Sequence, residues 1–223
     1  LELRGLDIGG GTPSSLSDEN FNYLMNIYDE TINGIKLKND FEPSLEATFN
    51  TLTEQKIKRM AQSNVLRLSL GIQTSNGDIL GWHHRENESL SNMIEKVECA
   101  WTHGIRKINV DLMYGLHWQN CNTIKNDLEL IKVLNPQQVT LYELRTNMIG
   151  YKNQFSKDNL YKQYMQYFEG LIMLGYYGRI GQNTFSKISN DYGVSSYLRK
   201  PSKGCRIFFL SFWEERRQHS KNG

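Results

Sequence analysis

The sequence predicts an α/β fold, a partial (β/α) barrel of parallel strands with helices on its outer side. Short apolar runs alternate along the chain with segments in which apolar residues recur at intervals of three and four, as they do in helices that pack one face on a core. Strands that alternate with helices in this way pair in parallel. The sequence carries no sign of the order reversal that marks an open sheet, and this favours a curled sheet.

Five strands and four helices make up the predicted alternation. The strands are expected at about 3–8, 45–50, 65–72, 107–113 and 138–144, and the helices at about 19–32, 90–101, 123–134 and 160–174. The apolar positions predicted to face the core are Phe21, Leu24, Ile27 and Tyr28 in the first helix, Leu90, Met93, Ile94, Val97 and Trp101 in the second, Ile124, Leu128, Ile131 and Leu134 in the third, and Leu160, Tyr164, Phe168, Leu171 and Leu174 in the fourth.

Composition narrows the class of protein. An apolar share of 39% is that of a globular chain, and 223 residues suffice for one core. A net charge of +2 is too small to favour nucleic acid or an anionic membrane as a partner. The sequence shows neither a bilayer-spanning stretch nor a leader peptide. Because Cys99, Cys121 and Cys205 are too widely spaced for a disulfide framework or a metal motif, we expect a cytoplasmic protein and no metal ligands in this chain.

A glycine-rich turn follows the first predicted strand. Gly9-Gly10-Gly11-Thr12-Pro13 comes directly after Leu6-Asp7-Ile8, and Ser17-Asp18-Glu19 then opens the next helix. Glycines let the backbone approach a ligand closely, since they have no Cβ. The spacing matches neither a dinucleotide-binding fingerprint nor a phosphate-binding loop. The turn is therefore a candidate ligand-binding loop, with a purely structural turn as the alternative.

Polar side chains stand at the carboxyl ends of the other predicted strands. Glu46, Gln73 and Asp111 end the second, third and fourth strands, and Arg85 follows Gln73 by twelve residues. The second strand also brings Asn50, and the fifth brings Tyr142, Glu143 and Arg145. Such groups suit a small zwitterion with hydroxyls, because Glu can hold an ammonium, Arg a carboxylate and Asp a ribose diol. Taken singly, each could instead be a helix cap, a strand-end hydrogen bond or a surface charge.

Five sequence blocks resemble, in order and spacing, the radical S-adenosylmethionine family. They are Gly9-Gly10-Gly11-Thr12-Pro13-Ser14, Glu46-Ala47, Leu68-Ser69-Leu70-Gly71-Ile72-Gln73, Asn109-Val110-Asp111-Leu112-Met113-Tyr114-Gly115-Leu116 and Leu141-Tyr142-Glu143-Leu144. The chain is most similar to the oxygen-independent coproporphyrinogen III oxidase group, which includes haem chaperones and several methyltransferases. The resemblance implies a partial barrel of the radical S-adenosylmethionine type that binds this cofactor and a [4Fe–4S] cluster at its mouth.

The resemblance also implies roles for individual residues. Gly10, Gly11 and Thr12 would bind the methionine amino group through backbone atoms, and Glu46 would help to hold the methionine moiety. Gln73, Arg85 and Asp111 match the remaining cofactor contacts of the family, with Asp111 on the ribose and Arg85 near the carboxylate.

The activity implied is reductive cleavage of S-adenosylmethionine to a 5′-deoxyadenosyl radical that acts on a tetrapyrrole-like substrate. An electron donor such as flavodoxin or ferredoxin would be a partner. Three alternatives stay open: a radical methyltransferase of the same architecture, a haem chaperone without turnover, and a plain α/β domain whose glycine loop is only a turn.

The chain departs from the family pattern at the cluster. The Cys-x3-Cys-x2-Cys loop that holds the family's cluster does not occur in the sequence, and the resemblance places it upstream of Leu1. We therefore expect residues 1–199 to be an incomplete barrel domain that lacks the first strand and the cluster loop, and 200–223 to be an irregular or truncated tail. This chain alone would then be inactive.

Two further departures concern the substrate. Leu116-His117-Trp118-Gln119 stands where the family usually has Leu-Pro-x-Gln, and residues 178–185 replace a Tyr-Glu-Ile-Ser-Asn run, so porphyrinogen as the substrate is in doubt. His83, His84 and His117 have the wrong spacing for a metal site.

Overall fold

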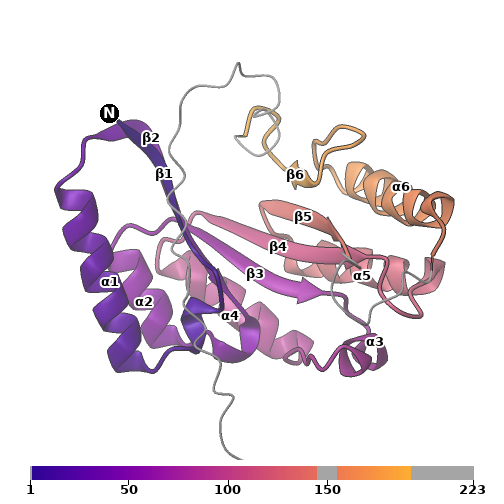
Figure 1. The fold of residues 1–223 in the computed structure, drawn as a ribbon, viewed down its shortest axis with the longest axis horizontal. Coiled ribbons are helices and arrows are strands. Elements are labelled where there is room, and N and C mark those ends of the chain that lie inside the picture. The colour runs from indigo at the N-terminus through magenta and orange to yellow at the C-terminus, as the bar shows by residue number, and fades with distance from the viewer. Residues whose placement is uncertain (1, 145–154, 192–223) are drawn as a thin grey trace, which may run out of the picture.

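In residues 2–144 and 155–191, which the computed structural model describes, a curled six-stranded sheet forms the centre of the protein (Figure 1). The strands are β1 (Leu3–Ile8), β2 (Leu37–Ala47), β3 (Arg67–Gln73), β4 (Lys107–Tyr114), β5 (Gln138–Glu143) and β6 (Thr184–Ser186). They lie side by side in chain order, with β1 to β5 parallel and β6 antiparallel to β5. The predicted α/β fold with a partial parallel barrel is confirmed.

Helices follow the parallel strands and lie along the outer side of the sheet (Figure 1). They are α1 (Asp18–Asn33), α2 (Glu54–Gln62), α3 (Gly77–Trp82), α4 (Leu90–Thr102), α5 (Cys121–Leu134) and α6 (Lys157–Met173), with short 3-10 helices η1 (Pro13–Ser15) and η2 (Phe49–Thr51). Each α-helix begins after a residue whose side-chain oxygen accepts a backbone N–H of the first turn: Ser17, Thr53, Asn76, Ser89, Asn120 and Ser156.

The five predicted strands and four predicted helices are all present, and the differences lie at their ends and between them. The second strand begins at Leu37 and ends at Ala47, so the prediction that it continues to 50 is wrong. The chain turns there into η2, because Thr48 is the last extended residue before a 3-10 turn. Three elements were not predicted from the sequence: α2, α3 and the antiparallel strand β6.

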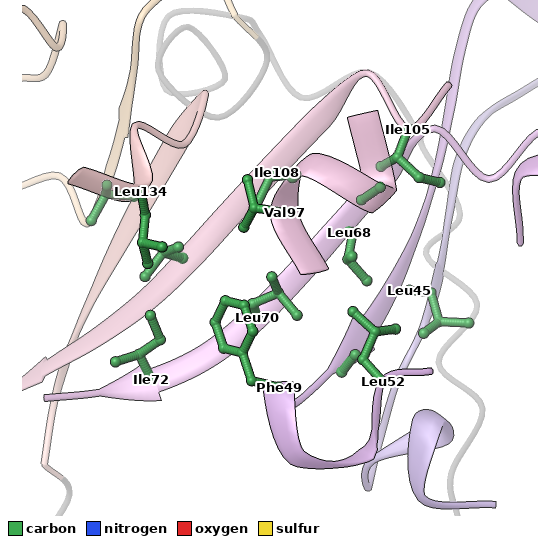
Figure 2. Close-up of a cluster of buried hydrophobic side chains, with 14 of the residues drawn as sticks. Leu45, Phe49, Leu52, Leu68, Leu70, Ile72, Val97, Ile105, Ile108 and Leu134 are labelled. Atoms are coloured by element: carbon green, nitrogen blue, oxygen red, sulfur yellow. The ribbon is translucent and has the colours of Figure 1, made fainter. Parts of the chain in front are cut away.

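The hydrophobic core fills the space between the sheet and its helices. Figure 2 shows Leu68, Leu70 and Ile72 of β3 pointing toward the layer that holds Val97 of α4. These four side chains are buried. Since successive residues of a strand face opposite sides, the two residues between them, Ser69 and Gly71, lie on the opposite face of the sheet.

Three residues predicted to be in the core are exposed instead. Leu90, Trp101 and Ile27 have exposed fractions of 46%, 37% and 37%. Leu90 is the first residue of α4. Ile27 precedes the buried Tyr28, and Trp101 follows the buried Ala100. One step along a helix rotates the side chain by about 100°, which turns Ile27 and Trp101 away from the buried face. In α1 the buried face is completed by Met25 rather than by Ile27.

Within the described residues, no helix has the length and apolar character needed to cross a membrane. The predicted tail at 200–223, Arg145 and Cys205 lie outside the described residues.

Candidate functional site

The inner face of the sheet carries a ladder of buried polar side chains. The Nδ2 of Asn109 on β4 donates hydrogen bonds to Ser69 Oγ (2.8 Å) and to Asp111 Oδ1 (2.7 Å). Ser69 Oγ donates to Asp111 Oδ2 at 3.2 Å, and Thr140 Oγ1 on β5 donates to Asn109 Oδ1 at 2.8 Å. The ladder joins three neighbouring strands, and both carboxylate oxygens of Asp111 are thereby held in a fixed orientation.

Asp111 has an unusual protonation equilibrium. Burial raises the pKa of its carboxyl to about 6, and the hydrogen bonds from Asn109 and Ser69 together with the charge of Arg67 oppose that rise. At neutral pH the residue is therefore an ionised, oriented acceptor in the second half of β4, which is suited to bind a pair of hydroxyl donors.

The glycine turn and Glu46 lie against each other. Gly9 follows β1, and Glu46 is the next-to-last residue of β2, which pairs with β1 in parallel. A Cβ built on Gly9 would lie 2.5 Å from the Oε2 atom of Glu46, so the carboxylate occupies the space that any other residue at position 9 would fill. Gly10 has a φ of +98°, which an L side chain rarely adopts. Glycine is thus required at 9 and 10 for the turn and Glu46 to meet.

A buried network fastens the same turn to the rest of the protein. Ser14 Oγ lies 2.5 Å from Thr51 Oγ1 and accepts the backbone N–H of Thr48 at 3.4 Å. The Nζ of Lys56, on α2, donates to the carbonyl oxygens of Ser14 (2.8 Å) and Thr51 (3.4 Å). The Lys56 side chain is 9% exposed. The role of Lys56 was not predicted from the sequence, because α2 itself was not predicted.

Gln73 ends β3 with a backbone φ of +65°. Its Nε2 lies 2.7 Å from the position that a Cβ on Gly71 would take, so the amide folds back over that glycine. The β3–β4 pairing shifts register between Gly71 and Gln73, which allows the strand to turn there.

The segment after Gln73 is held by a buried carboxylate. Asp127 Oδ1, on α5, accepts Thr74 Oγ1 (3.0 Å), Ser75 N (2.5 Å) and Ser75 Oγ (2.6 Å). Its other oxygen accepts the hydroxyl of Tyr167 on α6. Burial raises the pKa of Asp127, and these hydrogen bonds oppose the rise. This anchor was also missed, since Asp127 lies within a helical pattern far from the glycine turn in sequence.

Arg85 is the one predicted cofactor-binding residue that belongs to neither a strand nor the turn after β1. It is exposed in the loop between α3 and α4, and its backbone N–H donates to Leu80 O at 2.9 Å. Among the remaining strand-end residues, Asn50 Nδ2 donates to Glu86 O at 3.3 Å and Tyr114 OH donates to Glu143 Oε2 at 3.3 Å. The structure therefore brings Gly9 and Glu46 together and sets Gln73 and Asp111 on neighbouring strands, whereas Arg85 stands on a nearby connection.

The described cysteines do not fit an iron–sulfur cluster. Cys99 lies on α4 and Cys121 opens α5, and both are free thiols. Within the described ranges, no group of three or more His, Cys, Asp or Glu residues is arranged to hold a metal ion.

No family model matches the chain. The haem chaperone HemW of Haemophilus influenzae is 31% identical to it over 183 residues, which are 78% of this chain and 46% of that protein. HemW of Lactococcus lactis is 34% identical over 146 residues, 64% of this chain and 37% of that protein. The oxygen-independent coproporphyrinogen-III oxidase-like protein HemZ of Bacillus subtilis is 30% identical over 149 residues, 65% and 28% respectively. The chain thus spans about half of these relatives' length or less.

Solved structures share the fold. Coproporphyrinogen III oxidase HemN of Escherichia coli, described as a radical SAM enzyme, superposes with a TM-score of 0.74 at 21% identity, over 88% of this chain and 46% of that one. Elp3 of Methanocaldococcus infernus superposes with a TM-score of 0.57 at 17% identity, over 74% and 44%. These likenesses concern the half-barrel fold alone.

Proposed function

The chain belongs to the HemN/HemW-like group of radical S-adenosylmethionine proteins, and on that premise we propose that its polar strand ends bind S-adenosylmethionine. The observation that carries the proposal is the meeting of Glu46 with Gly9 beside the oriented carboxylate of Asp111. A cationic ammonium and a ribose diol are the two groups that such acceptors recognise.

The turn after β1 and Glu46 would hold the methionine end. Backbone atoms of Gly10, Gly11 and Thr12 and the Glu46 carboxylate together offer acceptors for an ammonium, because the glycines leave the backbone uncovered. The network of Lys56 fixes this turn before any ligand arrives, so little ordering is left to binding.

The other strand ends would hold the rest of the cofactor. Asp111 would accept the ribose hydroxyls, Gln73 would offer its amide from the end of β3, and Arg85 would pair with the carboxylate from the loop after α3. The exposure of Arg85 leaves its guanidinium able to reach a ligand.

When bound, S-adenosylmethionine would supply radical chemistry, and the one-electron reduction of its sulfonium would draw on the proposed [4Fe–4S] cluster and electron donor. The described residues bind and orient it, and the curled sheet screens it from water on the helix side. Because the described cysteines do not fit a cluster, the proposal assigns to them no part in that reduction.

The biological role we propose is the handling of a tetrapyrrole, with haem delivery as the first candidate. The names of the HemW relatives support it. The second candidate is an oxidase of the coproporphyrinogen type, which the similarity to HemZ favours. The proposed partners are a tetrapyrrole and an electron donor of the flavodoxin or ferredoxin class, in the cytoplasm, with one barrel domain over 1–199.

Binding of S-adenosylmethionine, measured by isothermal titration calorimetry, tests the proposal. Glu46→Gln and Asp111→Ala should each weaken binding by about tenfold or more, which corresponds to about 1.4 kcal/mol. Glu95→Gln, an exposed carboxylate on α4, should leave it unchanged. Absence of binding by the unaltered chain, or equal loss in all three variants, would contradict the assignment. Two further assays separate the two roles: stable retention of haem would indicate haem delivery, and decarboxylation of coproporphyrinogen would indicate the oxidase.

A further inference from the structure

Four rings gather where α3 meets the loop after β4. We call Trp82, His83, His117 and Trp118 the aromatic platform. The Trp82 and His117 rings are stacked, with centroids 4.1 Å apart and planes 5° apart. His83 meets Trp82 edge-on at 4.9 Å, and Trp118 lies 4.5 Å from His117 at 56°. Trp82 and Trp118 are 40% and 57% exposed, so the cluster is a surface rather than a piece of core.

The platform stands at the edge of the sheet that carries the candidate site. Its two segments follow β3, which ends at Gln73, and β4, which holds Asp111. Figure 1 shows α3 beyond the tip of the β3 arrow. Ligands of parallel α/β folds bind at the carboxyl ends of strands, and the platform therefore borders that region.

The backbone holds Trp118 in a conformation that bulky residues avoid. Its φ is +61°, in the left-handed region that favours glycine or asparagine. Strain of this kind persists where the surroundings enforce it, and it concentrates at ligand sites. An exposed indole that needs such a backbone is not explained by packing.

A rigid base supports both segments. Gln119, next to Trp118, accepts the backbone N–H of Leu116 at 3.2 Å and donates to Tyr167 OH at 3.0 Å. Tyr167 in turn donates to Asp127, which also holds the segment that leads into α3. One buried carboxylate thus fixes the bases of both segments, and the four rings are held in place before a ligand binds.

The ring angles define what the platform can hold. A flat ligand stacked on Trp118 would lie at 56° to the His117 imidazole, so the imidazole would present an edge rather than its face to the ligand. Trp82 stacks on His117 and fixes that orientation. The Nε2 of His83 accepts the backbone N–H of His117 at 3.4 Å, and His117 is the platform histidine whose ring contacts the exposed Trp118 indole, with centroids 4.5 Å apart.

We propose that the aromatic platform binds an iron tetrapyrrole, with the macrocycle against Trp118 and the His117 imidazole as an axial ligand to the iron. Large flat π-systems stack on indole rings, and imidazole is a common haem ligand. The choice of a tetrapyrrole rests on the proposed function, whereas the position of the site rests on the ring geometry.

Titration of the full chain with haemin and with metal-free protoporphyrin IX, followed by Soret absorbance and tryptophan fluorescence, tests the site. His117→Ala should weaken haemin binding by about tenfold and change the Soret maximum, while metal-free porphyrin binds as before. Trp118→Gly should weaken both by about tenfold. Because glycine relieves the positive φ, this variant should also keep its melting temperature.

Matched controls are His84→Asn and Trp101→Phe, a histidine and an exposed tryptophan outside the platform. Both should bind haemin as the unaltered chain does. Equal haemin affinity and spectra in all variants would overturn the site while the proposed function stands. Absence of porphyrin binding by the unaltered chain would also overturn the inference. The calorimetric titration with S-adenosylmethionine is a separate measurement and would still test the proposed cofactor site.

Discussion

The hydroxyl of Tyr167 on α6 donates a hydrogen bond to the carboxylate of Asp127 on α5, and that carboxylate also holds Thr74 and Ser75 beyond the end of β3. Asp127 is fully buried, and Tyr167 is too. A charge in that position is tolerated only with its full set of donors. The pair therefore couples the packing of two outer helices to the position of a loop at the candidate site.

Tyr167→Phe should lower the free energy of unfolding by about 1–3 kcal/mol, because one donor to a buried carboxylate is lost without a change in ring volume. Urea denaturation measures this. Tyr161→Phe is the matched control, since Tyr161 lies on the same helix and is 56% exposed. Equal midpoints for the two variants would show that the hydroxyl of Tyr167 adds nothing.

Gly9→Ala should weaken binding of S-adenosylmethionine by about tenfold or more, because the added methyl group displaces the Glu46 carboxylate. Gly34→Ala is the control: the added Cβ lies 3.8 Å from the nearest atom, the Thr31 carbonyl oxygen, at ordinary contact distance. If the combined variant Gly9→Ala with Glu46→Gln binds much more weakly than Glu46→Gln alone, Gly9 acts on the ligand independently of Glu46 and the explanation fails.

Lys56→Met should destabilise the fold by about 1–3 kcal/mol, because the carbonyl oxygens of Ser14 and Thr51 lose their buried donor. Affinity for S-adenosylmethionine should fall as well, since the glycine turn loses its anchor. Lys58→Met on the same helix removes only an exposed pair with Glu54 and should leave the urea midpoint and the affinity unchanged. If Lys56→Met keeps its affinity for S-adenosylmethionine, the hydrogen bonds of Lys56 do not contribute to the binding of this cofactor.

Asp111→Asn should stabilise the protein at neutral pH while it weakens ligand binding. The pKa of Asp111 is about 6 in the folded protein, against an ordinary value of 3.8. The folded state therefore binds the proton more tightly than the unfolded state does. Above the folded pKa the buried charge lowers the free energy of unfolding, and below 3.8 both states are protonated and the penalty vanishes.

The gain from Asp111→Asn should accordingly be about 1–3 kcal/mol near pH 8 and fade as the pH falls through 6 toward 3.8. Thermal or urea unfolding across that range measures it. Ser91→Ala, on the surface of α4, should show no pH-dependent gain. A gain that grows as the pH falls would mean that the carboxylate is favoured rather than penalised by its surroundings.

The alternation of strands and helices was predictable because most elements carry enough apolar residues to show their period. The exceptions lack that signal. In β2 the first residue, Leu37, is followed by Lys38, Asn39 and Asp40, which are exposed, so its first half shows no apolar run. α2 has few apolar residues, with Ile57 and Met60 on its buried face. β6 is three residues long, below the length at which alternation can be recognised.

The candidate site was predictable only as far as strand ends could be located. Glu46, Gln73 and Asp111 were proposed from the sequence because a parallel sheet places the carboxyl ends of its strands on one edge. Lys56 and Asp127 were missed because their roles depend on contacts with residues 42 and 52 positions away in sequence. Such contacts are fixed by packing, and a local pattern does not encode them.

The order of the strands has a consequence for how the chain folds. Each strand pairs with the one before it, so no pairing has to wait for a later part of the chain to arrive. Between successive parallel strands from β1 to β5 the chain forms one or two α-helices and no other strand, which keeps the entropy cost of loop closure low and the contact order small for a parallel sheet. The described strands can therefore join the sheet one at a time during synthesis.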